Sequence, residues 1–370
     1  MRIRTFFLLS MLFLLISCGD DSKTLTNTTY ISTFARSGIV KNDINRIKKL
    51  RLFYDKSANP IIYSYDNDKI FSYLYQNEKW TSNSELDGIN GVVDFARKDG
   101  ILYILNNNDE KFNLYVKTSD NIFIIDLANK LEIFGKIYGS SIIVDENKIY
   151  ISYIINESEV DFAYRSVTGG TWSKVVVNNS AETGSGFYTG SPFLLVKDEN
   201  RIFISYYDAG FGIPIVSEKL GDTWETLSVY KGNNSWMDMG EHQVLFLDNH
   251  GELGVFYNEK IEGKLYYSNF ITEVAKPEIL YEDGYVGDYI SGGLLGDMPF
   301  LLFYEGNRAS LKIVYRISQN KWEIKYVRSM GISGYYVDAV ARSSDIIGTV
   351  YLDELNDVMI FQEIPGWQLN

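Results

Sequence analysis

The chain has 370 residues, of which 45% are hydrophobic and 15% aromatic, and its formal net charge at pH 7 is -13. This apolar share excludes a disordered chain, and the length is enough to bury the core of one large or two ordinary domains. The excess of negative charge argues against nucleic acid as a partner, because no cationic surplus displaces counterions from phosphates. The single Cys excludes an intramolecular disulfide and a zinc site built from several Cys. With 28 Tyr and 21 Phe, the composition favours an all-β fold.

The first 17 residues have the pattern of a bacterial export signal. Two arginines precede an apolar run from Phe6 to Ile16, which is too short for an ordinary membrane span. The run ends in Leu15-Ile16-Ser17-Cys18, which resembles the lipobox of bacterial lipoproteins, where the Cys is lipidated and becomes the mature N-terminus. The alternative is a plain signal peptide with an incidental Cys, but the only Cys of the chain stands where a lipobox requires it. We therefore expect a signal peptide over residues 1–17 and a lipid anchor on Cys18.

Residues 18–29 form a polar tether between this anchor and the rest of the chain. Two acidic residues just after the Cys, Asp20 and Asp21, resemble the surface-export signal of lipoproteins in some Gram-negative phyla. The resemblance implies the bacterial cell envelope, at the outer membrane or the cell surface. It leaves open whether the protein faces the periplasm or the outside.

A repeat of about 49 residues runs through the remaining chain. Four Trp residues follow a turn, at spacings that are multiples of one step if two repeats lack the Trp: Trp80, Trp172, Trp224 and Trp322. A second series with this period occupies short alternating runs: Tyr75, Tyr115, Tyr164, Val216, Tyr266, Tyr315 and Phe361. A third consists of Tyr153, Tyr206, Tyr257, Tyr304 and Tyr351. We expect the tryptophans and both tyrosine series to be structural.

Each period predicts four short strands. The clearest case is the segment 191–229, where turn residues separate four runs of about six to eight residues. Regularly spaced four-stranded meanders are typical of a propeller. We therefore predict an all-β fold for residues 30–370, a seven-bladed β-propeller with four-stranded antiparallel blades. The last blade lacks a convincing fourth strand, which either residues 366–369 or the N-terminal segment 30–36 supplies; the second choice closes the ring.

One segment resembles the Asp-box repeats of sialidase-like bacterial β-propellers, whose pattern is Ser-x-Asp-x-Gly-x-Thr-Trp. Ser217, Gly221, Thr223 and Trp224 match this pattern, whereas Lys219 stands where the Asp belongs. The resemblance covers most of residues 45–365 as a degenerate repeat. It supports the fold better than an activity, because one fold carries many functions.

Sialidase activity is disfavoured by the missing arginine clamp. The resemblance implies a Phe/Tyr-Arg-Ile-Pro segment, three arginines that hold the substrate carboxylate, and a Tyr–Glu catalytic pair. The nearest match, Phe211-Gly-Ile-Pro214, has Gly212 in place of the Arg, so the bidentate partner of a carboxylate is absent there. A glycosidase of another kind needs two carboxylates across a cleft, and 48 acidic residues single out no pair. We assign no catalytic residue and favour binding over catalysis.

Metal and cofactor chemistry have little support in the sequence. The two histidines, His242 and His250, fall at opposite ends of an expected strand, too far apart to share an ion. The acidic loops 66–68 and 106–110 match no calcium-loop spacing, and no glycine-rich phosphate loop occurs. We expect no metal and no cofactor.

The blade topology brings a set of tyrosines to one face. In a meander, the loop into the first strand and the loop between the second and third strands emerge on the same face. The repeat step then predicts a mouth ringed by Tyr138, Tyr188, Asp238, Tyr289 and Tyr336. Around it we expect a polar belt that starts at Asp66, Asn106, Asn156, Asp208, Asn258, Glu305 and Asp353. Such a belt favours cationic or polyhydroxylated ligands over acidic ones.

Tyrosine combines a flat apolar face with a hydroxyl, which suits stacking on a sugar ring or gripping a peptide. The alternative is that these tyrosines pack between blades, as repeated aromatics do in propellers. We predict a lipid-anchored monomer that binds a glycan, a peptide or another envelope protein at this mouth. Two other hypotheses stay open. One is a glycoside hydrolase of sialidase-like fold with a non-sialic substrate, and the other is an envelope scaffold, which predicts an exposed apolar edge or patch in place of a pocket.

Overall fold

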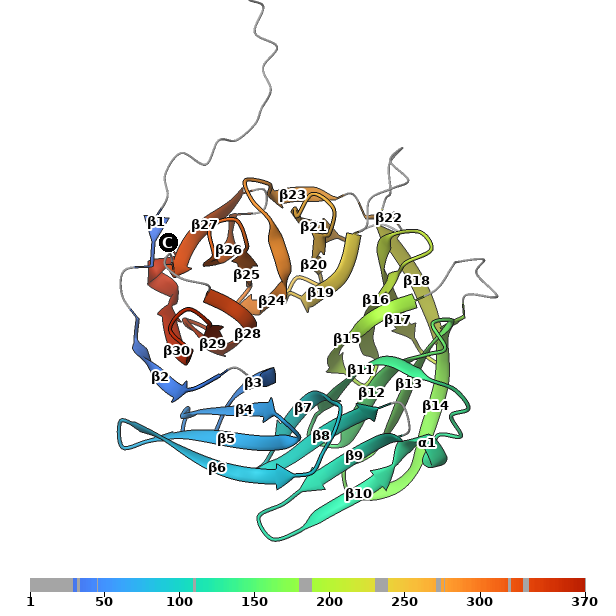
Figure 1. The fold of residues 1–370 in the computed structure, drawn as a ribbon. Helices are drawn as coiled ribbons and strands as arrows, with labels where there is room; N and C mark the ends of the chain where they lie inside the picture. Colours follow the sequence, from blue (N-terminus) through green and yellow to red (C-terminus); the bar gives the residue numbers. More distant parts are fainter. Residues whose placement is uncertain are drawn as a thin grey trace, which may run out of the picture.

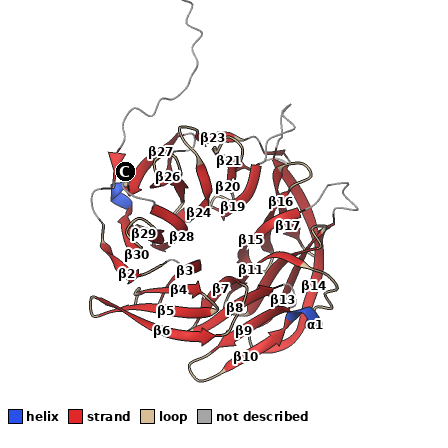
Figure 2. Ribbon diagram, viewed as in Figure 1, coloured by secondary structure: helices blue, strands red, loops and turns tan. Residues whose placement is uncertain are grey.

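The computed structural model describes residues 29–31, 34–44, 46–108, 111–179, 188–229, 239–270, 274–275, 277–318, 321–328 and 333–369. Seven antiparallel blades of four strands stand around a central axis (Figure 1), so the predicted seven-bladed β-propeller is confirmed. The helical structure in these residues is one α-helical turn, α1 (Leu127–Lys130), and one 3-10 turn (Gly366–Gln368) (Figure 2).

Each blade begins at the axis and ends at the rim. The innermost strands of blades 1 to 7 are β3 (Ile47–Tyr54), β7 (Val92–Lys98), β11 (Ile137–Val144), β15 (Tyr188–Asp198), β19 (Met239–Leu247), β24 (Val286–Leu295) and β28 (Ser333–Ser343). The second strands are β4 (Pro60–Asp66), β8 (Ile101–Asn108), β12 (Lys148–Ile155), β16 (Arg201–Asp208), β20 (Leu253–Glu259), β25 (Met298–Glu305) and β29 (Ile346–Asp353). The third strands are β5 (Lys69–Gln76), β9 (Lys111–Lys117), β13 (Glu159–Ser166), β17 (Ile213–Leu220), β21 (Leu265–Asn269), β26 (Ser310–Ser318) and β30 (Val358–Pro365). The outermost strands are β6 (Lys79–Asp87), β10 (Ile122–Asp126), β14 (Gly169–Asn179), β18 (Thr223–Val229), β23 (Glu278–Tyr281), β27 (Lys321–Arg328) and β2 (Arg36–Asn42).

The N-terminal strand β2 closes the ring. It pairs antiparallel with β30 as the outermost strand of blade 7, so the closure comes from the N-terminal side, slightly later in the chain than the expected segment 30–36. Arg36 links β2 to β30, because its Nε donates a hydrogen bond to Glu363 Oε2 at 2.7 Å. Two short strands, β1 (Thr29–Tyr30) and β22 (Val274–Ala275), add parallel partners to the outer strands β27 and β18.

The second strands form the most continuous part of the core. In β16, every residue from Ile202 to Asp208 is buried, because blades pack against both of its faces. The tyrosines of these strands are buried as expected, at exposures of 7% or less: Tyr153, Tyr206, Tyr257, Tyr304 and Tyr351. The hydroxyls of Tyr206, Tyr257 and Tyr351 have partners inside their blades, as at Tyr257, whose Oη lies 2.9 Å from Ser268 Oγ. Burial of the rings is therefore not opposed by an unpaired hydroxyl at that position.

Tryptophans of the outermost strands join neighbouring blades. Trp80 packs edge-to-face on Phe361 of blade 7, with ring centroids 5.4 Å apart. Trp224 meets Phe162 of blade 3 at 5.3 Å in the same way. These contacts confirm the structural role that the repeat predicted for the tryptophans.

The predicted signal peptide, Cys18 and the tether up to residue 28 lie outside the described residues. Among the residues that the structure describes, no helix is both long enough and apolar enough to cross a membrane. The lipid anchor therefore stays a prediction from the sequence.

Candidate ligand-binding site

All seven innermost strands have a β-bulge near their start, where the pairing with the second strand slips. The slips lie between Ile47 and Lys49, Val92 and Asp94, Ile137 and Gly139, Thr189 and Phe193, Met239 and Gln243, Val286 and Ile290, and Tyr335 and Asp338. A bulge bends its strand and turns side chains in a new direction. Because the seven bulges recur at one level of the propeller, they form a ring around one end of the axis.

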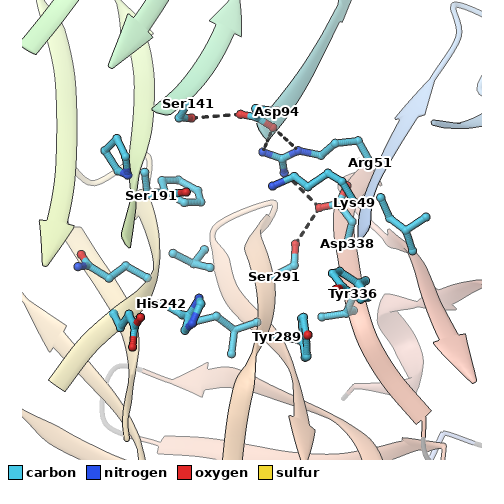
Figure 3. A pocket seen from close by; sticks show the side chains of 18 of the residues that line it. Lys49, Arg51, Asp94, Ser141, Ser191, His242, Tyr289, Ser291, Tyr336 and Asp338 are labelled. Atoms are coloured by element: carbon cyan, nitrogen blue, oxygen red, sulfur yellow. Dashed lines mark hydrogen bonds and ion pairs between the residues drawn. The ribbon is translucent and has the colours of Figure 1, made fainter. Parts of the chain in front are cut away.

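A pocket of about 320 Å³ lies inside this ring, and every innermost strand contributes to its wall (Figure 3). Its polar and aromatic side chains include Lys49, Arg51, Asp94, Ser141, Ser191, His242, Tyr289, Ser291, Tyr336 and Asp338. Apolar surface comes from Phe193, Val244, Ile290 and Val337. A mostly pre-formed concave site with a few convergent polar groups is the usual form of a small-molecule site.

Arg51 lies between two carboxylates of the neighbouring blades (Figure 3). Its Nε donates to Asp94 Oδ1 at 3.0 Å, and its Nη1 donates to Asp338 Oδ1 at 3.2 Å. The attraction of Asp94 is the largest influence on the pKa of Arg51 and raises it, despite the burial of the guanidinium. Arg51 is therefore permanently charged and fixed in place.

The two carboxylates are in turn held by backbone amides of adjacent blades. Asp338 Oδ2 accepts from the Leu52 N–H at 2.7 Å, and Asp94 Oδ2 accepts from the Ile142 N–H at 3.2 Å. Burial alone would raise the pKa of Asp94, but the charges of Arg51 and Lys49 and the backbone donors together hold it below its ordinary value. Asp94 therefore stays ionised, and its negative charge is committed to the protein itself.

Tyr289 and Tyr336 lie side by side on the pocket wall (Figure 3), with ring centroids 4.8 Å apart and an interplanar angle of 50°. Tyr336 sits in the bulge of β28 and has a φ of 49°. A bulky residue rarely adopts this left-handed conformation, and such strain concentrates at functional sites. The bulge thus turns a tyrosine ring toward Tyr289 at the cost of local backbone strain.

The other three residues of the predicted ring lie elsewhere. Tyr138 lies in the bulge of β11, is 40% exposed and does not line the pocket. The Nζ of Lys136 lies over its ring, 5.3 Å from the ring centroid. Tyr188 is fully buried and packs edge-to-face on Tyr206 at 5.1 Å, so the blade-packing alternative applies to it. Asp238 lies outside the described residues. The pocket therefore unites Tyr289 and Tyr336 of the five.

The expected polar belt around the mouth is largely wrong. Its members Asp208, Glu305 and Asp353 are fully buried, and Asn106 and Asn258 are nearly so. The carboxylates accept hydrogen bonds from the turns that follow them, as Asp208 Oδ1 does from the Gly210 N–H at 2.9 Å. These side chains stabilise turns, because acidic and amide groups satisfy backbone donors that the turn leaves unpaired. The belt therefore gives no reason to favour a cationic ligand.

The charged residues of the pocket were not predicted from the sequence. Lys49 and Arg51 stand in β3 and Asp94 stands in β7, and no sequence motif marks them. A signal was present in the repeat: Ser141 contacts Asp94 and Ser291 contacts Asp338, each across 47 residues, which is close to the period. Charged residues in an innermost strand, recurring at the repeat step, indicate a polar channel.

The sialidase resemblance contributes no residue to the pocket. The degenerate Asp-box over 217–224 forms the β17–β18 hairpin, and the segment 211–214 leads into β17. Of the histidines, His242 lines the pocket and His250 lies in the turn after β19. In the described part of the chain, no group of three His, Cys, Asp or Glu side chains is placed to hold a metal ion.

No protein-family model matches the chain, and no curated protein is detectably similar to it in sequence. Solved structures are similar in fold. The BP39L lectin from Burkholderia pseudomallei has a TM-score of 0.61 at 8% identity and covers 89% of this chain and 97% of its own. A catalytically inactive virginiamycin B lyase from Staphylococcus aureus with quinupristin has a TM-score of 0.59 at 13% identity, covering 89% of this chain and 99% of its own.

YCF48 bound to D1 peptide is a third similar structure. Its TM-score is 0.57 at 11% identity, and the match covers 91% of this chain and 97% of YCF48. At these identities the likeness shows a shared β-propeller fold and nothing about a shared ligand.

Proposed function

We propose that the protein is a binding protein of the bacterial cell envelope that holds a saccharide in the axial pocket. The observation that carries the proposal is the pair of Tyr289 and Tyr336, which presents aromatic surface beside fixed hydrogen-bonding groups. A sugar ring has an apolar face that packs on an aromatic ring, and its hydroxyls need polar partners. Ser291, Ser141 and His242 supply such groups within the same pocket.

The pocket chemistry favours binding over hydrolysis. A glycosidase needs one carboxylic acid that donates a proton and a second carboxylate placed across the sugar. Asp94 and Asp338 both bind the same guanidinium, and the pKa of Asp94 is held below its ordinary value. Neither geometry nor protonation therefore fits the required pair.

Two propellers of similar fold agree with a binding role without identifying a ligand. BP39L is a lectin, and YCF48 has been solved with a peptide. A peptide or an envelope protein is therefore the alternative ligand at the same pocket, and a binding screen distinguishes the two.

The test is a screen of the full-length chain, purified in detergent, against a glycan array and a peptide array. We expect a saccharide to bind, and we expect Tyr289→Ala to weaken that binding about ten-fold, the loss typical of one aromatic contact. Tyr138→Ala is the matched control, because Tyr138 is a bulge tyrosine outside the pocket. Binding of peptides alone, or equal binding by Tyr289→Ala, contradicts the proposal.

We further propose that the protein is exported and held at the membrane by a lipid on Cys18. The support is the match of Leu15-Ile16-Ser17-Cys18 to a lipobox and the polar segment that follows it. Cys18→Ser should transfer the protein from the membrane fraction to the soluble fraction, with unchanged thermal unfolding of the propeller. A protein that stays in the membrane fraction after this change refutes the anchor.

A scaffold role is the second candidate, and one surface favours it. The outermost strand of blade 2, β10, exposes Ile122, Phe123 and Ile124 by 43%, 56% and 63% at a sheet edge. Exposed apolar edges attract partner chains. If envelope assembly uses this edge, Ile124→Lys abolishes cross-linking to envelope neighbours in cells and leaves saccharide binding intact. Unchanged cross-linking rejects the scaffold role.

A further inference from the structure

The N-terminal strand β1 is fixed to the rim of blade 6. It pairs parallel with β27, where Thr29 lies opposite Lys325. The ring of Tyr30 stacks on that of Tyr326, with the centroids 5.1 Å apart. The next residue, Ile31, is buried, and its N–H donates to the Tyr326 carbonyl oxygen at 2.9 Å. These contacts determine where the N-terminal segment joins the propeller.

The direction of β1 sets it apart from the axial pocket. The innermost strands begin at the end of the axis that holds the pocket, because the bulges near their starts surround it. The four strands of blade 6 alternate in direction, so the outermost strand β27 runs the opposite way, toward the pocket end. Since β1 is parallel to β27, its N-terminal end points away from the pocket.

Only a short length of chain separates β1 from the proposed lipid. Thr29 is 11 residues after Cys18. A segment of that length spans about 40 Å when it is fully extended, and less in any other conformation. A lipid on Cys18 therefore holds the rim of blade 6 close to the bilayer surface.

An exposed tryptophan lies beside β1. Trp367 belongs to the 3-10 turn that follows β30, at the end of the propeller opposite the pocket, and it is 63% exposed. Lys325, which pairs with Thr29, donates from its Nζ to the carbonyl oxygen of Gln368. The turn and β1 are therefore neighbours, as Figure 2 also shows.

The chemistry of this turn suits a lipid surface. An indole ring combines apolar area with one N–H donor, and tryptophan is enriched where a membrane meets water. Residues 364–369 carry no charged side chain that would oppose contact with lipid. The other tryptophans that the structure describes are only partly exposed: Trp80, Trp172, Trp224 and Trp322.

The loops at the pocket end are less suited to lipid. They expose Phe134 and Leu355 by 89% and 66%. However, Glu132 and Glu354 are exposed next to these apolar side chains. A carboxylate that enters the lipid loses its hydration, which costs more than one apolar side chain gains. We therefore expect these loops to stay in water.

We infer that the propeller rests on the bilayer through the corner formed by β1 and the turn 366–368, with Trp367 in the lipid interface and the pocket turned away from the membrane. This inference rests on the proposed lipid anchor at Cys18. It also sets the route of the proposed saccharide, which reaches the pocket from the aqueous compartment and not from the lipids of the anchoring membrane.

The experiment places the full-length chain, purified with its lipid, in phosphatidylcholine vesicles with and without brominated acyl chains, which quench fluorophores that they contact. Trp367→Cys and Leu355→Cys are each labelled with the same dye, and the lipid on Cys18 leaves the introduced thiol as the one that reacts. Leu355 is the matched control, because it is similarly exposed at the pocket end. We expect brominated lipid to quench the dye at position 367 about two-fold and to leave the dye at position 355 unchanged, because only the first lies in the interface.

A second measurement needs no dye. Brominated lipid should quench part of the tryptophan emission of the unchanged chain, and Trp367→Phe should remove that quenching. Equal quenching at positions 367 and 355, or stronger quenching at 355, overturns the inference and leaves the anchor standing. If the unchanged chain does not float with the vesicles, the anchor and the inference both fail. Thermal unfolding shows whether each variant is folded.

Discussion

The innermost strands and the second strands belong to the same sheets, yet they differ in regularity and in what they bury. In the second strand β20, every residue from Leu253 to Glu259 is buried, and its pairing with the third strand is regular. The innermost strand of the same blade, β19, slips between Met239 and Gln243 and turns His242 toward the pocket. Strand pairing is therefore regular between the second and third strands, which hold the ring together, and irregular at the innermost strands, which form the pocket.

Two buried carboxylates show what the difference means for charge. Asp94, at the pocket wall, is 2% exposed, and its pKa is lowered because Arg51, Lys49 and backbone donors outweigh its burial. Asp161, inside blade 3 on β13, is fully buried, and burial together with the charge of Glu159 raises its pKa to about 7. The pocket wall therefore accommodates charge, whereas the blade interior opposes it.

The largest expected loss of stability comes from removing a core side chain of a second strand. Phe256 in β20 is fully buried and contacts Phe246, Tyr267 and Trp322. Phe256→Ala should lower the free energy of unfolding by about 3–5 kcal/mol, because the site cannot collapse around the cavity. Denaturant unfolding measures this, with Phe134→Ala as the control, since Phe134 is 89% exposed and should change stability by less than about 0.5 kcal/mol. Similar values for the two variants would contradict the assigned core.

A smaller loss is expected at the pocket wall. Arg51→Met leaves Asp94 and Asp338 buried without their shared cation, which should cost about 2–4 kcal/mol of unfolding free energy at pH 7. Lys56→Met removes only the exposed pair with Asp99 and should cost less than about 1 kcal/mol. Chemical denaturation of both variants compares them. If Arg51→Met is as stable as the unchanged chain, the Arg51 network does not hold the blades together.

The smallest expected effect is a gain in the free energy of unfolding, not a loss. Because the pKa of Asp161 is raised to about 7 in the folded state, its contribution to stability is complete below about pH 4 and is lost as the pH rises through 7. Asp161→Asn should therefore raise the free energy of unfolding by about 1–2 kcal/mol at pH 8 and change it little near pH 4.

Thermal unfolding of Asp161→Asn and of the unchanged chain at the two pH values measures this. Asp120→Asn, at an exposed turn, is the control with no expected pH-dependent difference. A destabilised Asp161→Asn at pH 8 would show that the ionised carboxylate is favourable in the blade interior.

The repeat predicts most of the fold because it is a local property. Tyr206 and Tyr257 recur at one step along the chain, and alternation in each strand fixes which face is buried. The same step grouped Tyr289 with Tyr336, and the structure brings both to the pocket wall. It failed at Tyr188, which is buried against Tyr206, because the period does not show how far a bulge displaces a residue along the axis.

The pocket itself could not be read from local pattern. Arg51 and Asp338 are 287 residues apart, and their contact exists because the ring closes. Likewise, the pattern gives no way to distinguish an acidic residue that reaches solvent from one that turns back to its own loop, as Asp208 does.

The seven-bladed repeat, its strands and the aromatic residues that join the blades follow from the amino-acid sequence alone, because each depends on spacing along the chain. Which charges meet on the axis and which carboxylates are buried are properties of the tertiary structure. Those properties depend on bulges and on contacts between distant blades, which arise when the first and last blades meet.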